Sequence, residues 1–212
     1  MVSTLLFAAL LSRPVLVETI EASEDVWVYS HASDPGGDSA LRIFGNGGNA
    51  VAASAGDLES FSYGYLKFDV SAVAKDKKLA SAELVLTPAG KPAVDPAAKD
   101  WPLEVRPLVG TFSEKTWGFE MAGEVKPSAK SLYGSGVIKT TTADDTFEIR
   151  INLLGEKSAF ANDFAKLTDK LFVALTSKYD ASEQGMKGMY KVFSKDNKER
   201  GLRPRLEIKF AD

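Results

Sequence analysis

The chain has 212 residues, of which 44% are hydrophobic and 26% are charged, a composition typical of a globular domain rather than a disordered or fibrous chain. Its net charge of −3 argues against nucleic-acid binding, which usually requires a basic excess. The absence of cysteine excludes disulfides and thiol nucleophiles, and the single histidine, His31, excludes zinc sites built on two imidazoles.

The amino-terminal segment contains a short apolar run at residues 5–11. The run is too short to span a bilayer, which takes about 20 residues, but it fits the apolar region of an export signal. We interpret residues 1–22 as a signal peptide or amino-terminal extension, with an ordinary first strand or helix as the alternative. This interpretation predicts a protein that is secreted, periplasmic or on the cell surface. No other segment is predicted to cross a membrane.

Short runs of alternating apolar and polar residues follow, and they predict antiparallel strands with one buried face. One segment, 156–168, has the apolar spacing of a helix. Together these elements predict a single all-β domain at residues 23–212, an antiparallel β-sandwich that is jelly-roll-like and has one short helix. The runs lie at 26–29, 41–43, 65–69, 84–86, 103–105, 147–153, 171–175 and 206–210.

The segments between these runs are rich in turn-forming residues. Residues 45–49 read Gly-Asn-Gly-Gly-Asn and predict a tight turn, because glycine and asparagine tolerate left-handed conformations. Residues 89–100 and 121–135 are polar or rich in small residues and are predicted to be surface loops.

No specific catalytic constellation is present. His31 lies beside Ser33 and near Asp38, but the chain has no Gly-x-Ser-x-Gly elbow. Adjacent carboxylate pairs such as Asp144–Asp145 would point to opposite faces of a strand, so they do not form an acid–base dyad. The sequence therefore predicts a protein that is not an enzyme, with no catalytic residue and no cofactor other than a structural calcium ion.

One stretch offers hard oxygen ligands of the kind that calcium prefers. Its candidate ligands are Asp25, Asp34, Asp38, Asn46 and Asn49. The alternative is that these are plain loop residues.

Four cationic residues lie at strand positions whose side chains are predicted to point away from the core, between apolar residues that point inward. They are Arg42, Lys67, Arg106 and Arg150, with Tyr65 beside them. Cations spread over a sheet face would match the carboxylates of an acidic polymer, so these five residues are the predicted substrate-binding site. The alternative is ordinary solubilising charge.

Several sequence segments occur in a characteristic order, at 25–30, 41–46, 65–70, 80–86, 112–117, 193–195 and 203–208. This order resembles the DNRLRE domain family, a group that includes carbohydrate-binding modules for alginate. The resemblance implies an extracellular β-sandwich that binds an acidic polysaccharide. The namesake hexapeptide is absent, and the segment after Trp117 lacks the usual Asn and Pro.

The function predicted at this point is that of a non-catalytic extracellular module that binds an acidic polysaccharide such as alginate. One alternative is a structural or adhesive surface domain that associates with cell-surface or secreted proteins and has no sugar site. A polysaccharide lyase is a further alternative.

Overall fold

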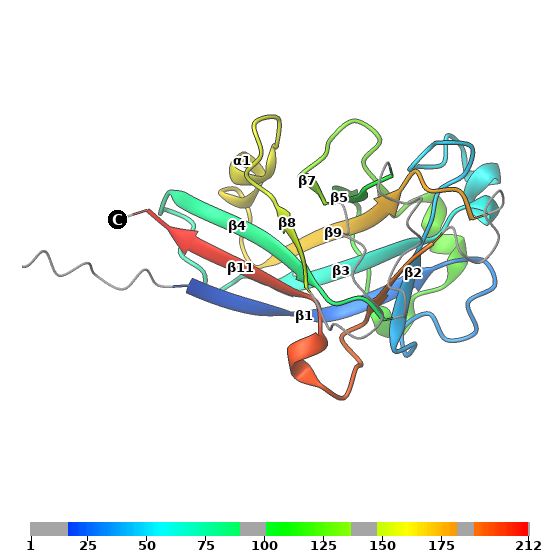
Figure 1. The fold of residues 1–212 in the computed structure, drawn as a ribbon, viewed down its shortest axis with the longest axis horizontal. Helices are drawn as coiled ribbons and strands as arrows, with labels where there is room; N and C mark the ends of the chain where they lie inside the picture. The colour runs from blue at the N-terminus through cyan, green and yellow to red at the C-terminus, as the bar shows by residue number, and fades with distance from the viewer. Residues whose placement is uncertain (1–16, 90–100, 137–147, 182–188, 212) are drawn as a thin grey trace, which may run out of the picture.

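A computed structural model of the protein describes residues 17–89, 101–136, 148–181 and 189–211. These residues form a mostly β fold of antiparallel strands, with short helices between them (Figure 1). The strands are β1 (Val17–Val28), β2 (Ala40–Ile43), β3 (Tyr63–Asp69), β4 (Leu79–Leu86), β5 (Leu103–Val109), β6 (Lys126–Pro127), β7 (Gly134–Gly136), β8 (Ile149–Asn152), β9 (Lys170–Ser177), β10 (Tyr190–Phe193) and β11 (Arg205–Phe210). The helices are the α-helix α1 (Phe160–Phe164) and the 3-10 helices η1 (Ala55–Ser60), η3 (Glu114–Thr116), η4 (Phe119–Gly123) and η6 (Arg200–Leu202).

Most of the strands belong to one curled antiparallel sheet. Its order is β6-β5-β9-β3-β1-β11-β4-β8, with β7 also paired to β5, while β2 and β10 form a separate two-stranded sheet. The long strand β1 connects the two halves of the curled sheet, because its first part pairs with β11 and its second part with β3. The pairing register shifts between Ala22 and Glu24, a bulge that bends the strand at the changeover. The start of β1 and the carboxyl terminus lie at the same end of the molecule (Figure 1).

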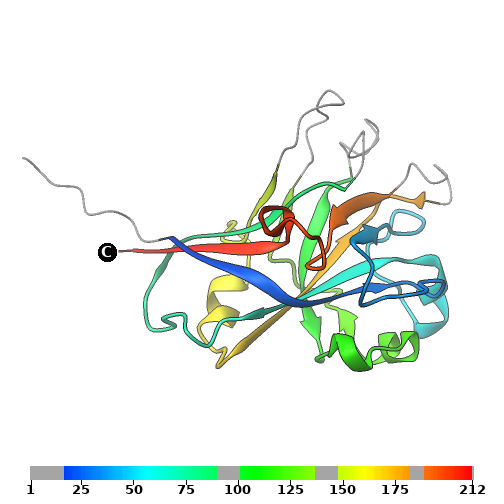
Figure 2. The ribbon, with the colours of Figure 1, turned by 90° about the horizontal axis from the view of Figure 1, so that it is seen from below.

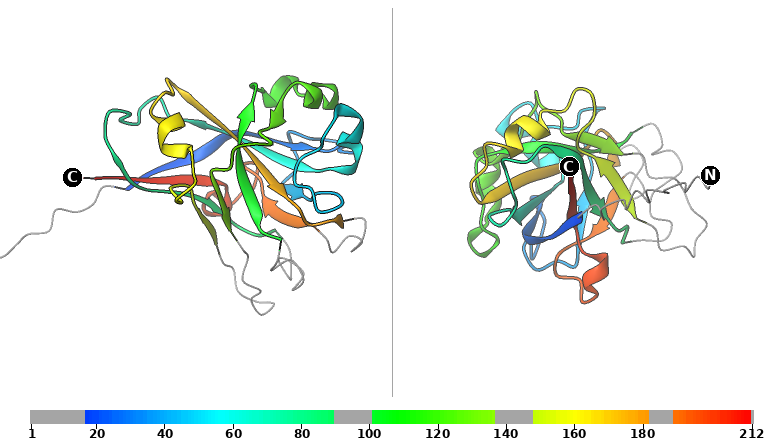
Figure 3. Two further views of the ribbon diagram at one scale, coloured as in Figure 1. Left: turned by 90° about the horizontal axis from the view of Figure 1, so that it is seen from above. Right: turned by 90° about the vertical axis from the view of Figure 1, so that its left-hand side faces the viewer.

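Strand β7 narrows the gap between the two ends of the curled sheet. It pairs with β5 and lies against β8, so the sheet has the form of a half-barrel (Figure 3). A Cβ atom at Gly134 would lie 2.3 Å from the carbonyl oxygen of Asn152, and one at Gly136 would lie 2.9 Å from the Ile151 side chain. Residues without a Cβ are therefore required where β7 passes β8.

The two faces of the curled sheet bury separate hydrophobic clusters. The inner cluster takes side chains from both halves of the sheet, from β2 and β10, and from Phe160 and Phe164 of α1. The outer cluster lies over β1, β3 and β9 and includes Tyr63 and Tyr65. Helices η1 and η4 lie side by side and cover this outer cluster (Figure 2). The outer face of the sheet is thus partly a second core.

The antiparallel β prediction is confirmed, and each predicted run contributes to a strand. The tight turn at 45–49 is also confirmed, because Gly47 and Gly48 have φ values of 54° and 75° and Asn46 and Asn49 exchange backbone hydrogen bonds. The helix is shorter than the predicted 156–168, since one turn is enough to bury the stacked rings of Phe160 and Phe164.

The segment 121–135 is not the plain surface loop that its composition suggests. It contains part of η4 and the short strand β6, and it reaches β7. Ala122, Val125 and Tyr133 are buried. Most of the other predicted loop, 89–100, lies outside the described residues.

The folded domain takes in residues that the sequence assigned to the amino-terminal extension. Strand β1 begins at Val17, and Val17 to Glu21 pair with β11. Cleavage near Ala22 would remove this half of the strand. Within the described ranges, no helix has the length and apolar character that a membrane crossing requires.

Candidate functional site

The four cations predicted to bind substrate are each paired with acidic side chains of the same chain. Arg42 also lies over the Trp27 ring, with its guanidinium carbon 4.4 Å from the ring centroid. A paired cation has less charge to offer to an external polyanion, so these contacts weaken the electrostatic case for this site. The pairs are Arg42–Asp38 (2.7 Å), Lys67–Glu24 (2.6 Å), Arg106–Glu104 (2.7 Å), Arg150–Glu83 (3.1 Å), Arg150–Glu148 (2.7 Å) and Arg150–Glu207 (2.7 Å).

The same four cations do not gather in one place. Lys67 and Arg106 lie on the outer face of the curled sheet with β9 between their strands. Arg150 is on β8 at the far end of the strand order, and Arg42 is on β2 of the separate sheet. The sequence predicted the outward phase of each residue but not the strand order that separates them.

Tyr65 is not on an exposed surface, which corrects its prediction as a substrate-binding residue. Its side chain shares a face with Lys67, but that face is covered by Phe112, Trp117 and Val125 of the outer cluster. The Tyr65 hydroxyl donates a 2.9 Å hydrogen bond to the Val125 carbonyl oxygen. Burial raises the pKa of Tyr65 above its ordinary range. Tyr65 is a core residue.

The five candidate calcium ligands have separate partners and do not form one cluster. Asp34 accepts a hydrogen bond from the Gly37 amide, Asp38 pairs with Arg42, and the Asn49 side chain donates to the Gly47 carbonyl. Asn46 and Asn49 belong to the tight turn. Asp25 is buried on β1, and its neighbours are other acids.

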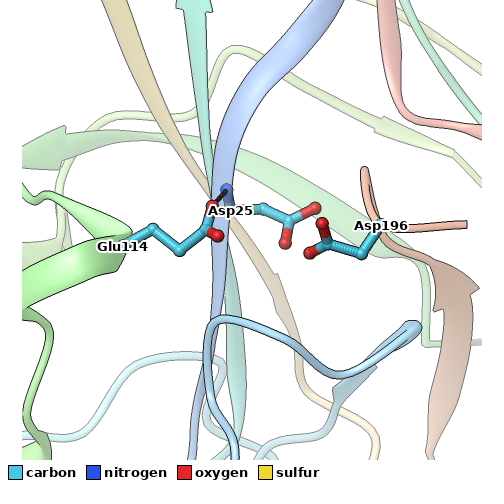
Figure 4. Close-up of side chains that lie close together, drawn as sticks. All are labelled: Asp25, Glu114 and Asp196. Carbon is cyan, nitrogen blue, oxygen red and sulfur yellow. Dashed lines mark hydrogen bonds between the residues drawn. The ribbon is translucent and has the colours of Figure 1, made fainter.

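Asp25, Glu114 and Asp196 form what we call the acidic cluster. One carboxylate oxygen of each lies within 4.8 Å of the other two. Figure 4 shows the Asp25 carboxylate directed toward Asp196, while Glu114 accepts a 3.3 Å hydrogen bond from the Asp25 amide. The oxygens are spaced closely enough for a divalent cation. However, the Lys195 Nζ atom already lies 3.0 Å from Glu114 and 2.7 Å from Asp196, so a cation of the chain itself pairs with two of the three acids.

Asp25 is the buried member of the acidic cluster, with 1% of its surface exposed. Its Oδ2 atom accepts a 2.6 Å hydrogen bond from the Lys195 amide. Burial raises the pKa of Asp25 to about 7, the Lys195 amide opposes that rise, and the carboxylate of Asp196 reinforces it. For the Lys195 ammonium group, burial acts in the opposite direction and lowers the pKa. The hydrogen bonds to Asp196 and Glu114 outweigh burial, so the pKa of Lys195 is raised overall.

An open depression of about 370 Å³ lies over the acidic cluster. We call it the acidic depression. It places carboxylate oxygens, which accept hydrogen bonds, beside the half-buried indole of Trp117. Trp117 is held edge-to-face against Tyr65 and Phe112, so its ring has a fixed orientation. The lining residues are Asp34, Pro35, Gly36, Gly37, Glu114, Trp117 and Asp196.

Only part of the acidic cluster and of the acidic depression was foreseen. Asp25 and Asp34 were candidate ligands, but Glu114 and Asp196 were not. Asp25, Glu114 and Lys195 come from the segments 25–30, 112–117 and 193–195, which are far apart in the sequence, so no local pattern joined them.

His31 is exposed, and its ring contacts the edge of Tyr29. Among the hydrogen bonds of the described residues, none joins His31 to a serine or an aspartate.

No family model matches the chain, and no curated protein matches it.

Proposed function

We propose that this chain is a non-catalytic extracellular module that binds a polysaccharide, and that the polymer lies across the acidic depression. The observation that carries the proposal is the placement of Asp34, Glu114 and Asp196 beside the Trp117 ring. Sugar hydroxyl groups donate hydrogen bonds to carboxylates, and the apolar face of a sugar ring packs on an aromatic plate. The resemblance to the DNRLRE family supports the same class of function, because three of its segments meet at the acidic cluster.

The charge of the depression bears on which polymer fits. A uronate polymer such as alginate would meet three acidic side chains in the depression, two of which share the ammonium group of Lys195, while the cations predicted to attract it are paired elsewhere. The geometry therefore supports a neutral polysaccharide better than an acidic one. The acidic polymer predicted from the sequence stays a hypothesis that the same experiment tests.

The experiment is isothermal titration with a soluble neutral glucan and with alginate, at low and high salt. Two exposed acids of the depression are changed, Asp34→Ala and Asp196→Ala, singly and together, and exposed Asp76→Ala in the loop after β3 is the matched control. A charge-assisted hydrogen bond contributes about 1.5–3 kcal/mol, so we expect each change to weaken glucan binding about tenfold or more. The control should bind as the wild type does.

Three outcomes would contradict this proposal. Salt-sensitive binding of alginate that Lys67→Ala weakens, with no glucan binding, would restore the acidic polymer and the cationic site. Binding to neither polymer would favour the structural or adhesive domain, which the ion pairing of all four predicted cations also favours. An increase in absorbance near ~235 nm on incubation with a polyuronate, from the unsaturated product of elimination, would instead indicate a lyase.

The β-sandwich and jelly-roll arrangement also belongs to the proposal. It is supported by the two-stranded sheet, because Leu41 and Ile43 of β2 and Val192 of β10 join the inner cluster of the curled sheet. An experimental structure in which β2 and β10 lie away from the inner face would contradict a two-layered arrangement.

Export is the remaining part of the proposal. Because β1 pairs with β11 from Val17 onward, we expect the mature protein to begin at or before Val17 rather than after Ala22. Mass spectrometry of protein recovered from the medium or periplasm would test this, and a mature protein starting at Ser23 would contradict it.

A further inference from the structure

A second, smaller pocket lies between η1 and η4, over the outer cluster of the sheet. Its volume is about 50 Å³. Ala55 and Leu58 line it from η1, and Ala122 and Gly123 line it from η4. The two helices lie side by side, so the pocket has a wall on each side (Figure 2). It shares no lining residue with the acidic depression and is therefore a separate site.

The wall of this pocket is mostly apolar and built from small side chains. Ala52, Ala122 and Gly123 keep the interior open, while Leu58 and Pro127 add apolar surface. A charged group would lose its water against such a wall without compensation. The pocket therefore favours an occupant with a small apolar end.

The hydroxyl group of Tyr63 is the polar feature of the wall. Tyr63 is 1% exposed, and its oxygen accepts a 2.8 Å hydrogen bond from the amide of Ala52, which also lines the pocket. Within the described ranges, the hydroxyl hydrogen of Tyr63 has no acceptor. Burial raises the pKa of Tyr63, so the hydroxyl keeps its proton. A buried donor without an acceptor is costly, and a carbonyl oxygen in the pocket would satisfy it.

The volume of the pocket limits its occupant to a small group. A site for one water molecule takes about 10–15 Å³, so the pocket holds about three to five groups of that size. A whole sugar ring is too large. An acetyl group with its linking nitrogen or oxygen has about the right number of non-hydrogen atoms, and it combines an apolar methyl with a carbonyl oxygen.

We propose that this pocket, which we call the acetyl pocket, binds the acetyl group of an N-acetylated or O-acetylated sugar. The methyl group packs against Ala52, Ala122 and Leu58, and the carbonyl oxygen accepts a hydrogen bond from the Tyr63 hydroxyl. The identification of the ligand as a sugar rests on the proposed function, whereas the choice of an acetyl group rests on the pocket alone.

Contacting aromatic rings join the acetyl pocket to the acidic depression. The ring centroids of Tyr63 and Tyr65 are 6.3 Å apart, and those of Tyr65 and Trp117 are 5.6 Å apart. The rings of Tyr63 and Trp117 are therefore separated by no more than the sum of these two distances. A short oligosaccharide spans such a distance, which allows one acetylated polymer to contact both sites.

A carboxylate is the alternative occupant, because Lys126 also lines the acetyl pocket. Lys126 is exposed, so its ammonium group is hydrated and attracts an anion only weakly. The apolar wall and the neutral hydroxyl of Tyr63 favour a neutral carbonyl group over a carboxylate.

The experiment is saturation-transfer difference NMR on the full chain with N-acetylglucosamine, an O-acetylated glucose and glucose. We expect the acetyl methyl protons of both acetylated probes to receive the strongest saturation, and glucose to give no comparable signal. Binding of one acetylated probe alone would support the pocket and identify the linkage as amide or ester. Tyr63→Phe should raise the Kd of the acetylated probes about two- to tenfold, because one hydrogen bond is lost.

A pocket-filling variant and a matched control make this test specific. Gly123→Leu places a side chain in the pocket and should abolish the acetyl signal, while Gly201→Leu in η6 should leave it unchanged. Both positions tolerate a side chain: a Cβ at Gly123 would be 4.0 Å from its nearest neighbour, and one at Gly201 would have none within 4 Å. Gly123→Leu keeps the test decisive if Tyr63→Phe does not fold.

Three results would overturn the acetyl pocket. They are an acetyl signal that is the same in Gly123→Leu as in wild type, no acetyl signal from either probe, and salt-sensitive binding of glucuronate that Lys126→Gln abolishes. Titration with an unsubstituted glucan separates this inference from the proposed function. Glucan binding without acetyl binding would reject the acetyl pocket alone, and acetyl binding without glucan binding would retain the pocket and reject the proposed role of the acidic depression.

Discussion

The ion pair between Arg106 and Glu104 offers the clearest test of whether a predicted binding cation stabilises the fold instead. The two side chains are 12% and 8% exposed, and Arg106 Nη2 lies 2.7 Å from Glu104 Oε2. Arg106 also donates to the Ser128 carbonyl, which fixes the segment that leads into β7. In Arg106→Met, the Glu104 carboxylate keeps the Thr176 hydroxyl as a donor but loses its counter-ion.

Removing one partner of a buried ion pair costs about 3–5 kcal/mol, because the remaining charge is left without compensation. For a domain of this size each kcal/mol lowers Tm by about 2–4 °C, so Arg106→Met should lower Tm by about 6–20 °C. Arg200→Met is the matched control, since Arg200 is 74% exposed and pairs with Glu21 alone among the described residues. An exposed pair contributes about 0–1 kcal/mol, and the control should lose no more than about 4 °C.

The assay is thermal and urea unfolding followed by circular dichroism, with glucan and alginate titrations on the folded variants. Adding Glu104→Gln to Arg106→Met should recover part of the lost stability, because the uncompensated charge is then removed. Equal losses in the two single variants would refute the distinction between buried and exposed pairs. An Arg106→Met variant of normal stability that no longer binds alginate would show that Arg106 is a binding cation after all.

Four further changes have defined outcomes. Gly134→Ala should lower the free energy of unfolding by about 1–3 kcal/mol in a urea titration, because the new Cβ would lie 2.3 Å from a backbone oxygen of β8. Gly155→Ala is the control and should have little effect, because the space around Gly155 is open. The hydrogen bond from Lys170 lowers the pKa of Asp69, so this carboxylate stabilises the fold above about pH 4 and the contribution is lost as pH falls. The difference in unfolding free energy between wild type and Asp69→Asn should therefore shrink from pH 6 to pH 2. A difference that stays constant over this range would contradict the prediction. Tyr65→Phe should cost about 1 kcal/mol of stability and leave polysaccharide affinity unchanged, and a loss of affinity in the folded variant would return the residue to the binding site. Adding millimolar calcium should leave Tm unchanged, because an ammonium group already lies between two members of the acidic cluster; a rise in Tm that a chelator reverses would establish a calcium site.

The alternation of apolar residues predicted the strands well because burial of one face requires it. Ile149 and Ile151 are buried and Arg150 between them is exposed, as the pattern on β8 indicates. The same rule failed for Tyr65, since the outer face of β3 is covered by a segment whose buried residues, Ala122 and Val125, show no periodicity. Local pattern cannot reveal a second core that is completed from elsewhere in the chain.

The site was harder to foresee than the strands because it depends on strand order. Whether Lys67 is free or paired is decided by Glu24 lying opposite it on β1, and the sequence does not specify that pairing. The acidic cluster depends on the same information, since Glu114 and Asp196 reach Asp25 only through the fold. Residue types alone selected Asp25 and Asp34 but not the burial and the neighbouring acids that raise the pKa of Asp25.

The glycine strand β7 also has a consequence for the behaviour of many copies of this protein together. Unpaired strand edges invite pairing with a neighbouring molecule, which leads to aggregation. Here β7 occupies the edge of β5 and lies against β8, so one short segment shields both ends of the curled sheet. Both ends of the curled sheet are therefore less open to pairing with another copy of the protein.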